Sequence, residues 1–122
     1  MPKILIAEDE PDLRNFLRDE LTDQRFAVTA VGNGADAIVA AAEDTYDVYL
    51  LDMLMPGLDG IQVIRVLRKL TPHVPILGLT GHVGRGYMAQ ASSYGVTCLS
   101  KPVQVDDLIR EIREALATRR LV

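Results

Sequence analysis

The sequence of 122 residues has little of several features that mark specialised classes of protein. It contains one cysteine, Cys98, which excludes an internal disulfide framework and is typical of a reducing compartment. No apolar stretch is long enough to span a membrane, and the first apolar run is too short for a signal peptide. The formal net charge of -4 argues against nucleic-acid binding, which normally requires a basic patch. We therefore expect a soluble, cytoplasmic protein that contacts neither membrane nor nucleic acid.

The remaining composition is that of an ordinary globular protein, with 48% hydrophobic and 25% charged residues. A chain of this length buries a sufficient hydrophobic core without disulfides or a structural metal. We find no internal repeat, low-complexity tract or linker, so one domain spanning 1–122 is expected.

Strand patterns alternate with helix patterns along the whole chain. Strands are expected at 3–7, 26–31, 47–51, 76–79 and 96–99. Helices are expected at 11–24, 35–43, from Asp59 to Leu70, 83–94 and 104–118. This alternation predicts right-handed βαβ units and therefore an α/β fold: a doubly wound five-stranded parallel sheet inside an α/β/α sandwich.

The third predicted strand ends on a carboxylate. A run of bulky apolar residues stops at Asp52, and a loop punctuated by Pro56, Gly57 and Gly60 follows. Open α/β sheets bind their ligands at the carboxyl ends of their strands. Because an unpaired buried charge is costly, Asp52 is a candidate functional residue. The alternative is that its side chain only caps the loop.

Charged or hydroxyl side chains that could act together with Asp52 also follow three other predicted strands. Glu8 and Asp9 follow the first strand, Thr80 follows the fourth and Lys101 follows the fifth. Converging carboxylates repel one another unless a cation lies between them, and hard oxygen ligands favour Mg²⁺. A hydroxyl and an ammonium both suit phosphoryl oxygens, and a carboxylate that attacks phosphorus yields an aspartyl phosphate.

Each of these residues also has an ordinary structural interpretation. Glu8 and Glu10 are compatible with solvated charges beside a helix N-terminus, with Glu10 pointing to water. Lys101 is compatible with a surface turn and Thr80 with a simple strand-end hydroxyl. Their joint occurrence at successive strand ends favours a functional site.

The acidic pair, the segment 52–60, Thr80 and the Lys101-Pro102 pair together resemble the response-regulator receiver domain of two-component signalling, and the resemblance covers the entire chain. It implies a flavodoxin-like fold with strand order 2-1-3-4-5. It also implies that Asp52 is the phosphoacceptor, with Thr80 turning toward the phosphoryl group and Lys101 forming an ion pair with it. The peptide bond between Lys101 and Pro102 is expected to be cis.

The same resemblance implies a Mg²⁺ site. Asp9, Asp52 and the backbone carbonyl of Leu54 match the protein ligands of the ion, and Glu8 matches the acid that holds a metal-bound water. Glu8 replaces the more common aspartate, which makes this side chain one methylene longer.

Two further departures from the family pattern concern the switch. Gly81 follows the threonine where alanine is common, which loosens that loop. Cys98 stands three residues before the lysine, where the family usually has tyrosine or phenylalanine, and the segment 95–101 is one residue shorter than usual. We therefore expect the response to be carried by repacking of 83–94, with Tyr87 or Tyr94 filling the space.

The resemblance implies a phosphorylation-controlled switch rather than a turnover enzyme. A sensor histidine kinase or a histidine phosphotransfer protein donates the phosphoryl group, and the fourth helix, fifth strand and fifth helix contact an output domain or a downstream protein; we also consider a homodimer. Leu54 and His82 are expected to shape the approach of water, and the bulky Leu54 predicts slow autodephosphorylation.

Three alternatives have specific requirements. A phosphohydrolase of the haloacid dehalogenase type needs a second aspartate two residues after the nucleophile, where Leu54 stands. A flavin-binding flavodoxin-like protein needs a Gly/Ser/Thr-rich phosphate loop after the first strand, where 8–10 is acidic. A receiver-like fold kept only for interactions does not need the intact set of Asp52, Thr80 and Lys101.

Overall fold

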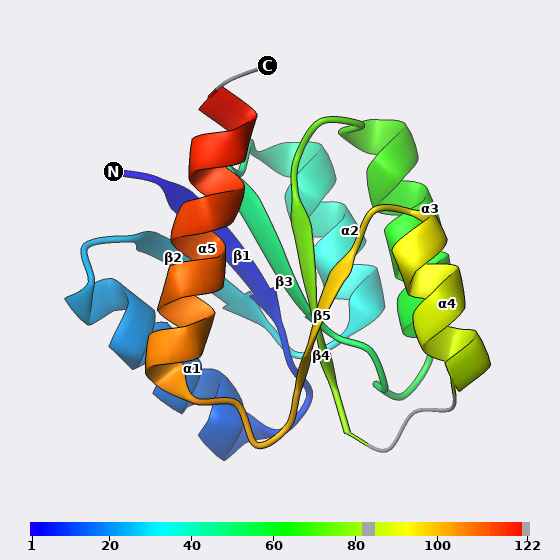
Figure 1. Ribbon diagram of the computed structural model, residues 1–122, viewed down its shortest axis with the longest axis horizontal. Helices are drawn as coiled ribbons and strands as arrows, with labels where there is room; N and C mark the ends of the chain where they lie inside the picture. Colours follow the sequence, from blue (N-terminus) through cyan, green and yellow to red (C-terminus); the bar gives the residue numbers. More distant parts are fainter. Residues whose placement is uncertain (82–84, 121–122) are drawn as a thin grey trace.

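The structure is a computed structural model that describes residues 1–81 and 85–120. Its strands are β1 (Lys3–Ala7), β2 (Ala27–Val31), β3 (Val48–Asp52), β4 (Ile76–Thr80) and β5 (Thr97–Ser100). Its helices are α1 (Pro11–Asp23), α2 (Gly34–Glu43), α3 (Gly60–Leu70), α4 (Arg85–Ser93) and α5 (Val105–Arg120). All strands pair in parallel in the order β2-β1-β3-β4-β5, which confirms the predicted sheet (Figure 1).

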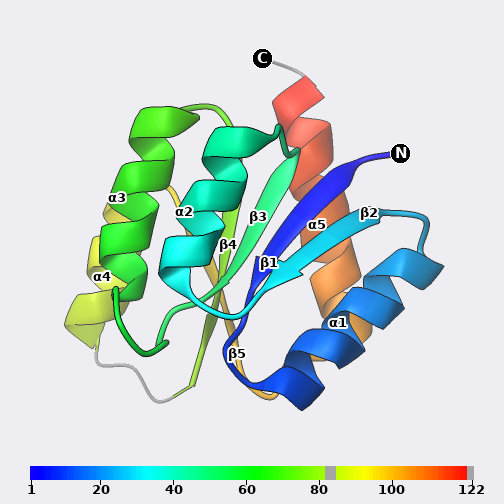
Figure 2. The ribbon, with the colours of Figure 1, turned by 180° about the vertical axis from the view of Figure 1, so that it is seen from behind.

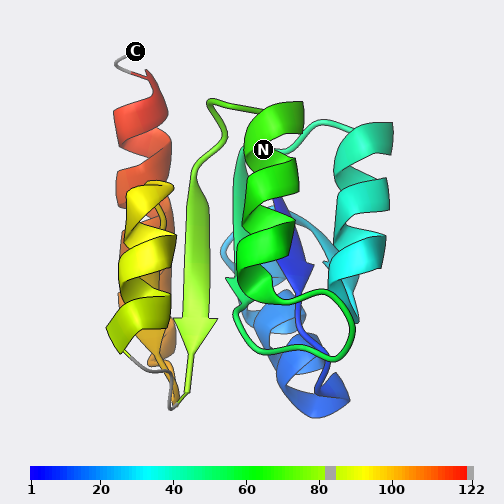
Figure 3. The ribbon, with the colours of Figure 1, turned by 90° about the vertical axis from the view of Figure 1, so that its right-hand side faces the viewer.

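A separate hydrophobic core covers each face of the sheet. Residues of α2, α3 and α4 form one core, to which Leu5 of β1 contributes. Residues of α1 and α5 form the other, to which the neighbouring Ile4 and Ile6 contribute, because successive side chains of a strand point to opposite faces. Figure 3 shows the sheet between α5 on one side and α2 and α3 on the other. The fold is a flavodoxin-like, three-layer α/β/α sandwich.

The central strands are buried along their whole length. Every residue of β3 and β4 is buried, as are four of the five residues of β1. Strands covered on both faces read as continuous apolar runs, which is why the sequence pattern locates them well. The only polar residues of β3 and β4 that are not tyrosine, Asp52 and Thr80, each occupy the last position of their strand.

Helix α1 begins with a cap that the sequence interpretation missed. Pro11 occupies the first turn as predicted, but the Glu10 side chain does not simply point to water. Its carboxylate accepts hydrogen bonds from the backbone N–H groups of Asp12 (3.0 Å) and Leu13 (2.6 Å). These amides have no partner within the helix, so a nearby carboxylate satisfies them. Glu10 is therefore part of the helix N-terminus.

The loop that follows Asp52 ends in a well-defined helix start. Asp59 caps α3, as predicted, and forms a capping box with Gln62: Gln62 N–H donates to Asp59 Oδ1 (2.9 Å), and Asp59 N–H donates to Gln62 Oε1 (3.2 Å). The cap therefore fixes the point at which the Asp52 loop ends and α3 begins.

The predicted element bounds differ from the observed ones by at most two residues, and those of β1 are identical. At β3 the observed strand runs from 48 to 52, one residue later than the predicted 47–51, and Asp52 is its last residue, at the carboxyl end where it was expected. Asp47 lies outside β3, and its carboxylate accepts a hydrogen bond from Lys3 N–H (2.8 Å). Over 1–81 and 85–120, no helix combines the length and apolar character needed to cross a membrane.

Candidate functional site

The carboxyl ends of the strands meet at one edge of the sheet, at the bottom of Figure 1. Glu8 and Asp9 follow β1 directly, Asp52 ends β3, Thr80 ends β4 and Lys101 follows β5. The parallel sheet therefore places all five predicted side chains on one edge, although up to about ninety residues separate them in sequence.

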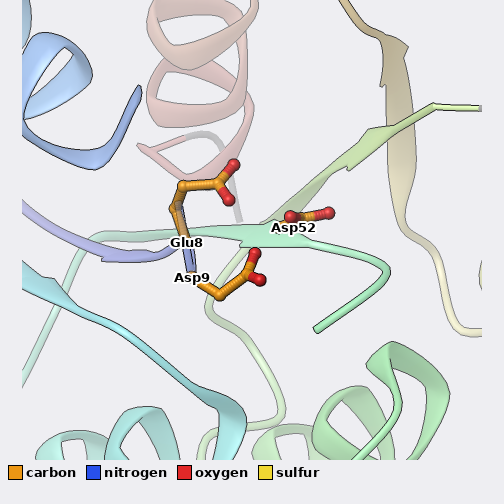
Figure 4. A group of neighbouring side chains, drawn as sticks. All are labelled: Glu8, Asp9 and Asp52. Atoms are coloured by element: carbon orange, nitrogen blue, oxygen red, sulfur yellow. The ribbon is translucent and has the colours of Figure 1, made fainter. Parts of the chain in front are cut away.

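Three carboxylates gather at this edge. One oxygen each from Glu8, Asp9 and Asp52 lies within 4.8 Å of the others (Figure 4). Glu8 is fully buried and Asp52 is 4% exposed, whereas Asp9 is exposed. A group of hard oxygen donors, two buried and one open to solvent, fits Mg²⁺, which binds one or two carboxylates and keeps several waters.

Lys101 lies against both buried carboxylates. Its Nζ donates to Asp52 Oδ2 (2.9 Å) and forms an ion pair with Glu8 Oε1 (3.1 Å). Burial by itself lowers the pKa of a lysine, but the bonds to Asp52 and Glu8 outweigh it and raise the pKa of Lys101 above its ordinary value. The ammonium therefore stays charged and offsets the repulsion between the two carboxylates. The peptide bond that follows it, to Pro102, is cis, as the resemblance implied.

Glu8 has the most perturbed carboxyl group of the site. Burial is the main cause, followed by a hydrogen bond with Asp52, and together they raise the pKa of Glu8 from 4.5 to about 7. Glu8 Oε2 accepts a hydrogen bond from Glu10 N–H (3.2 Å). Oε1 is buried beside Lys101 without hydrogen-bond geometry to any described residue. Glu8 is therefore poised between its neutral and charged forms near neutral pH.

Both oxygens of Asp52 are engaged. Oδ1 accepts a hydrogen bond from Leu54 N–H (3.1 Å), and Oδ2 accepts the one from Lys101. Two donors from different segments fix the orientation of the carboxylate. The Leu54 side chain is 53% exposed, so it points away from the core. That the Leu54 carbonyl is a metal ligand stays a prediction.

The Thr80 side chain faces β5 in this conformation. Thr80 is buried, and its hydroxyl donates to the backbone carbonyl of Leu99 (3.4 Å). The backbone carbonyl of Thr80 accepts a hydrogen bond from Lys101 N–H (2.6 Å), which ties β4 to the residue that carries the ammonium. The hydroxyl is thus at the correct edge of the sheet but is engaged with a neighbouring strand.

Sequence reasoning missed two supports of the site. The Arg14 guanidinium donates to the Glu8 backbone carbonyl (2.9 Å) and so fixes the acidic loop from α1. Met53, the residue after Asp52, packs closely against two glycines: a Cβ at Gly78 would come within 2.9 Å of the Met53 sulfur, and one at Gly60 within 2.8 Å of the Met53 carbonyl. The one available signal was Gly78, because a glycine inside a strand often marks a close approach.

Cys98 lies where the resemblance implies a switch aromatic. Its Sγ would be 3.3 Å from a Cβ at Gly78, and its thiol is half-buried, which raises its pKa. Cys98 and Tyr94 pack against the same hydrophobic core. That a tyrosine fills the space stays a prediction, because the Tyr87 side chain lies outside the described part of the structure, as do His82 and the segment 82–84.

The fold and the site together define a class of protein: doubly wound α/β proteins with a buried aspartate, further carboxylates and a lysine at the carboxyl edge of the sheet. A family model described as the response regulator receiver domain matches residues 4–113. The chain therefore belongs to the response regulator receiver family of two-component signalling, as its motifs indicated.

The relatives of this chain include both short and long regulators. The response regulator receiver protein CpdR of Brucella abortus is 33% identical over 117 residues, which cover 95% of this chain and 98% of that protein. The uncharacterized transcriptional regulatory protein YkoG of Bacillus subtilis is 36% identical, but the match covers 93% of this chain and 50% of that protein. A response regulator receiver domain protein from Clostridium thermocellum has a TM-score of 0.94 at 29% identity, covering 99% and 98% of the two chains.

Proposed function

We propose that Asp52 accepts a phosphoryl group from a phosphohistidine of a sensor histidine kinase or a histidine phosphotransfer protein. A carboxylate oxygen of Asp52 attacks phosphorus, the P–N bond to the imidazole breaks, and an aspartyl phosphate forms. The observation that carries this proposal is the Asp52 carboxylate itself, buried and held by Leu54 N–H and Lys101 within 4.8 Å of two more acids. Few structural roles require such an arrangement.

The residues proposed to hold Mg²⁺ are Asp9, Asp52 and the Leu54 carbonyl, with Glu8 binding a water of the ion. Receiver domains typically use Mg²⁺ at this acidic site, and the oxygen donors here fit it. When bound, the ion neutralises charge on the phosphoryl oxygens and orients them. Asp9 is exposed, so this member of the proposed ligand set is directly accessible to solvent.

Lys101 and Thr80 are proposed to respond to the phosphoryl group. The Lys101 ammonium bonds Asp52 before transfer and is in reach of a phosphoryl oxygen afterwards. The Thr80 hydroxyl would exchange the Leu99 carbonyl, at the long distance of 3.4 Å, for a stronger charge-assisted bond to that group. This exchange would displace the loop after β4 and bias the packing of α4.

The proposed output is a change at the face formed by α4, β5 and α5, which would contact an output domain or a downstream protein. We treat 1–122 as one receiver domain that acts as a phosphoacceptor and resets by slow autodephosphorylation, since Leu54 has no group that orients water. The chain spans nearly all of CpdR and half of YkoG, so both a stand-alone regulator and a longer protein are consistent with its relatives.

The test is intact-mass measurement after incubation with acetyl phosphate or phosphoramidate and Mg²⁺. We expect one phosphoryl adduct in the native chain and none in Asp52→Asn. When EDTA is present from the start, the native chain should form no adduct. Asp47→Asn is the matched control, because Asp47 is an aspartate on the opposite edge of the sheet. An adduct that persists in Asp52→Asn, or that forms equally in EDTA, would overturn the assignment.

A further inference from the structure

Helix α3 is basic in an acidic protein. It carries Arg65, Arg68 and Lys69 and no acidic residue, whereas the whole chain has a net charge of -4. Arg68 is used within the fold, where its guanidinium donates to the backbone carbonyls of Tyr94 and Val74. Arg65 and Lys69 are exposed, and neither has a carboxylate within ion-pair distance among residues 1–81 and 85–120. Two free cations thus lie one helical turn apart on the outer surface.

These cations border an apolar groove of about 300 Å³, here called the α3 groove. Its lining consists of Leu58, Gln62, Arg65, Val66 and Lys69. Leu58 comes from the loop between Asp52 and α3 and is 36% exposed, so part of its side chain is available to a partner. The groove therefore offers apolar contact at its floor and positive charge at its rim, so it fits an acidic helix with one bulky apolar side chain.

Helix α1 has that pattern on its outer face. Asp12, Phe16, Asp19 and Asp23 recur at the i, i+4, i+7, i+11 spacing of one helix face, and all four are exposed. Phe16 is 46% exposed and stands in the middle of the carboxylates. Asp19 has an ion pair with the neighbouring Arg18 (3.3 Å), but both side chains are largely solvated. The α1 face thus offers the acidic charges and the bulky apolar side chain that complement the basic, apolar α3 groove.

We infer that the α1 face of one copy of this chain docks into the α3 groove of a second copy. Phe16 would enter the groove against Leu58 and Val66, and the carboxylates would face Arg65 and Lys69. The contact cannot form within one molecule, because α1 and α3 pack into different cores and lie on opposite sides of the strands (Figure 2). The association is therefore head-to-tail, with a free groove and a free α1 face at its ends.

The contact is expected to be weak and dependent on salt, because its charges are exposed. Sedimentation equilibrium without a phosphoryl donor tests it, over about 1 µM to about 1 mM protein. At low salt we expect the weight-average mass of the native chain to rise with concentration, and at high salt to stay near that of the monomer. Since no donor is added, the result is independent of the proposed role of Asp52.

Charge-reversal variants identify the surfaces. We expect Arg65→Glu with Lys69→Glu, and separately Asp12→Lys with Asp19→Lys, to weaken self-association by at least about tenfold. Phe16→Ala, which changes no charge, should also weaken it. The control is Lys3→Glu at the amino edge of the sheet, outside both surfaces, which changes the net charge by half as much as the groove variant and should lower association by no more than this smaller change in net charge requires.

Mixing gives the decisive result. The groove variant (Arg65→Glu with Lys69→Glu) keeps the acidic α1 face, which complements the native groove of the α1 variant (Asp12→Lys with Asp19→Lys). The new lysines of the α1 variant in turn complement the new glutamates of the groove variant. An equimolar mixture should therefore associate, although each variant alone does not. A native chain that stays monomeric at low salt, a mixture that stays monomeric, or a control that loses association as fully as the groove variant would each overturn the inference. Circular dichroism of each variant establishes that it is folded.

Discussion

Two lysine–carboxylate pairs lie at opposite edges of the same sheet. At the carboxyl edge, Lys101 contacts Glu8 and Asp52, two buried acids. At the amino edge, Lys3 pairs with Asp44, and its Nζ also lies 5.3 Å from the centre of the Tyr46 ring. The side chains of Lys3 and Asp44 are 37% and 53% exposed, against 27% for Lys101 and 5% for Asp52. Both edges therefore have a lysine ammonium beside a carboxylate, and the two pairs differ in how deeply they are buried.

Burial determines what each pair does. Water screens the pair at the amino edge, so its formation or loss changes little. At the carboxyl edge, one cation offsets two carboxylates in a poorly solvated environment, where unbalanced charge is costly. The arrangement is therefore kept at a cost to stability, and such a cost is typical of sites that bind or react.

The largest expected effect is that of Lys101→Met. Without the ammonium, two buried carboxylates face each other, and we expect the free energy of unfolding at pH 7 to fall by about 3 kcal/mol. The loss should be smaller at pH 5, because Glu8 takes up a proton. Urea unfolding in EDTA at both pH values measures it. Equal loss at both would show that the role of Lys101 is packing alone.

Glu8→Gln tests the effect of burial at the carboxyl edge through the pH dependence of stability. Folded Glu8 holds its proton up to about pH 7, whereas the unfolded chain releases it near 4.5, so the folded state binds more protons in this window. Stability of the native chain should therefore fall as pH rises from about 4.5 to about 7, by about 3 kcal/mol. Glu8→Gln should flatten this dependence and be the more stable protein at pH 8. Urea midpoints across the range, in EDTA, measure it; an unchanged slope would contradict the raised pKa.

The sequence predicts the contents of the carboxyl edge because of one topological fact. The carboxyl ends of parallel strands meet, so Asp9, Asp52 and Lys101 could be assigned to a common site from their positions at strand ends. The sheet order came from the family resemblance rather than from periodicity. Apolar strands and the Asp59 cap were likewise evident from pattern alone.

What could not be predicted depends on contacts between side chains of distant elements. The bond from Arg14 to the Glu8 carbonyl and the packing of Met53 against Gly78 both arise only when the layers are assembled. Glu10 was misassigned to solvent because its spacing to the helix start allows both a free and a capping carboxylate. The amides of the first turn decide between these, and they have no signal of their own in the sequence.

The neighbouring acids Asp9 and Glu10 are expected to have different roles, Asp9 as a metal ligand and Glu10 as a helix cap. Asp9→Ala should weaken Mg²⁺ binding by at least about tenfold, because Asp9 belongs to the group of converging oxygens. Glu10→Ala should leave Mg²⁺ affinity nearly unchanged but lower the free energy of unfolding by about 1 kcal/mol through loss of the α1 cap. A Mg²⁺ titration and urea unfolding of both variants test this. Equal effects on Mg²⁺ binding would contradict the assignment of Asp9.

The smallest expected effect is that of Lys3→Met, the counterpart of Lys101→Met at the amino edge. The hydrogen bond from Lys3 Nζ lowers the pKa of Asp44, but both partners are solvated and Asp44 is charged at pH 7 with or without the lysine. The Met side chain keeps an apolar stem beside Tyr46, and the backbone bond from Lys3 N–H to Asp47 is untouched. We therefore expect the urea midpoint at pH 7 to match that of the native chain within error, at low and at high salt. A loss comparable to that of Lys101→Met would show that burial does not distinguish the two edges, and that the expected cost of removing Lys101 has another cause.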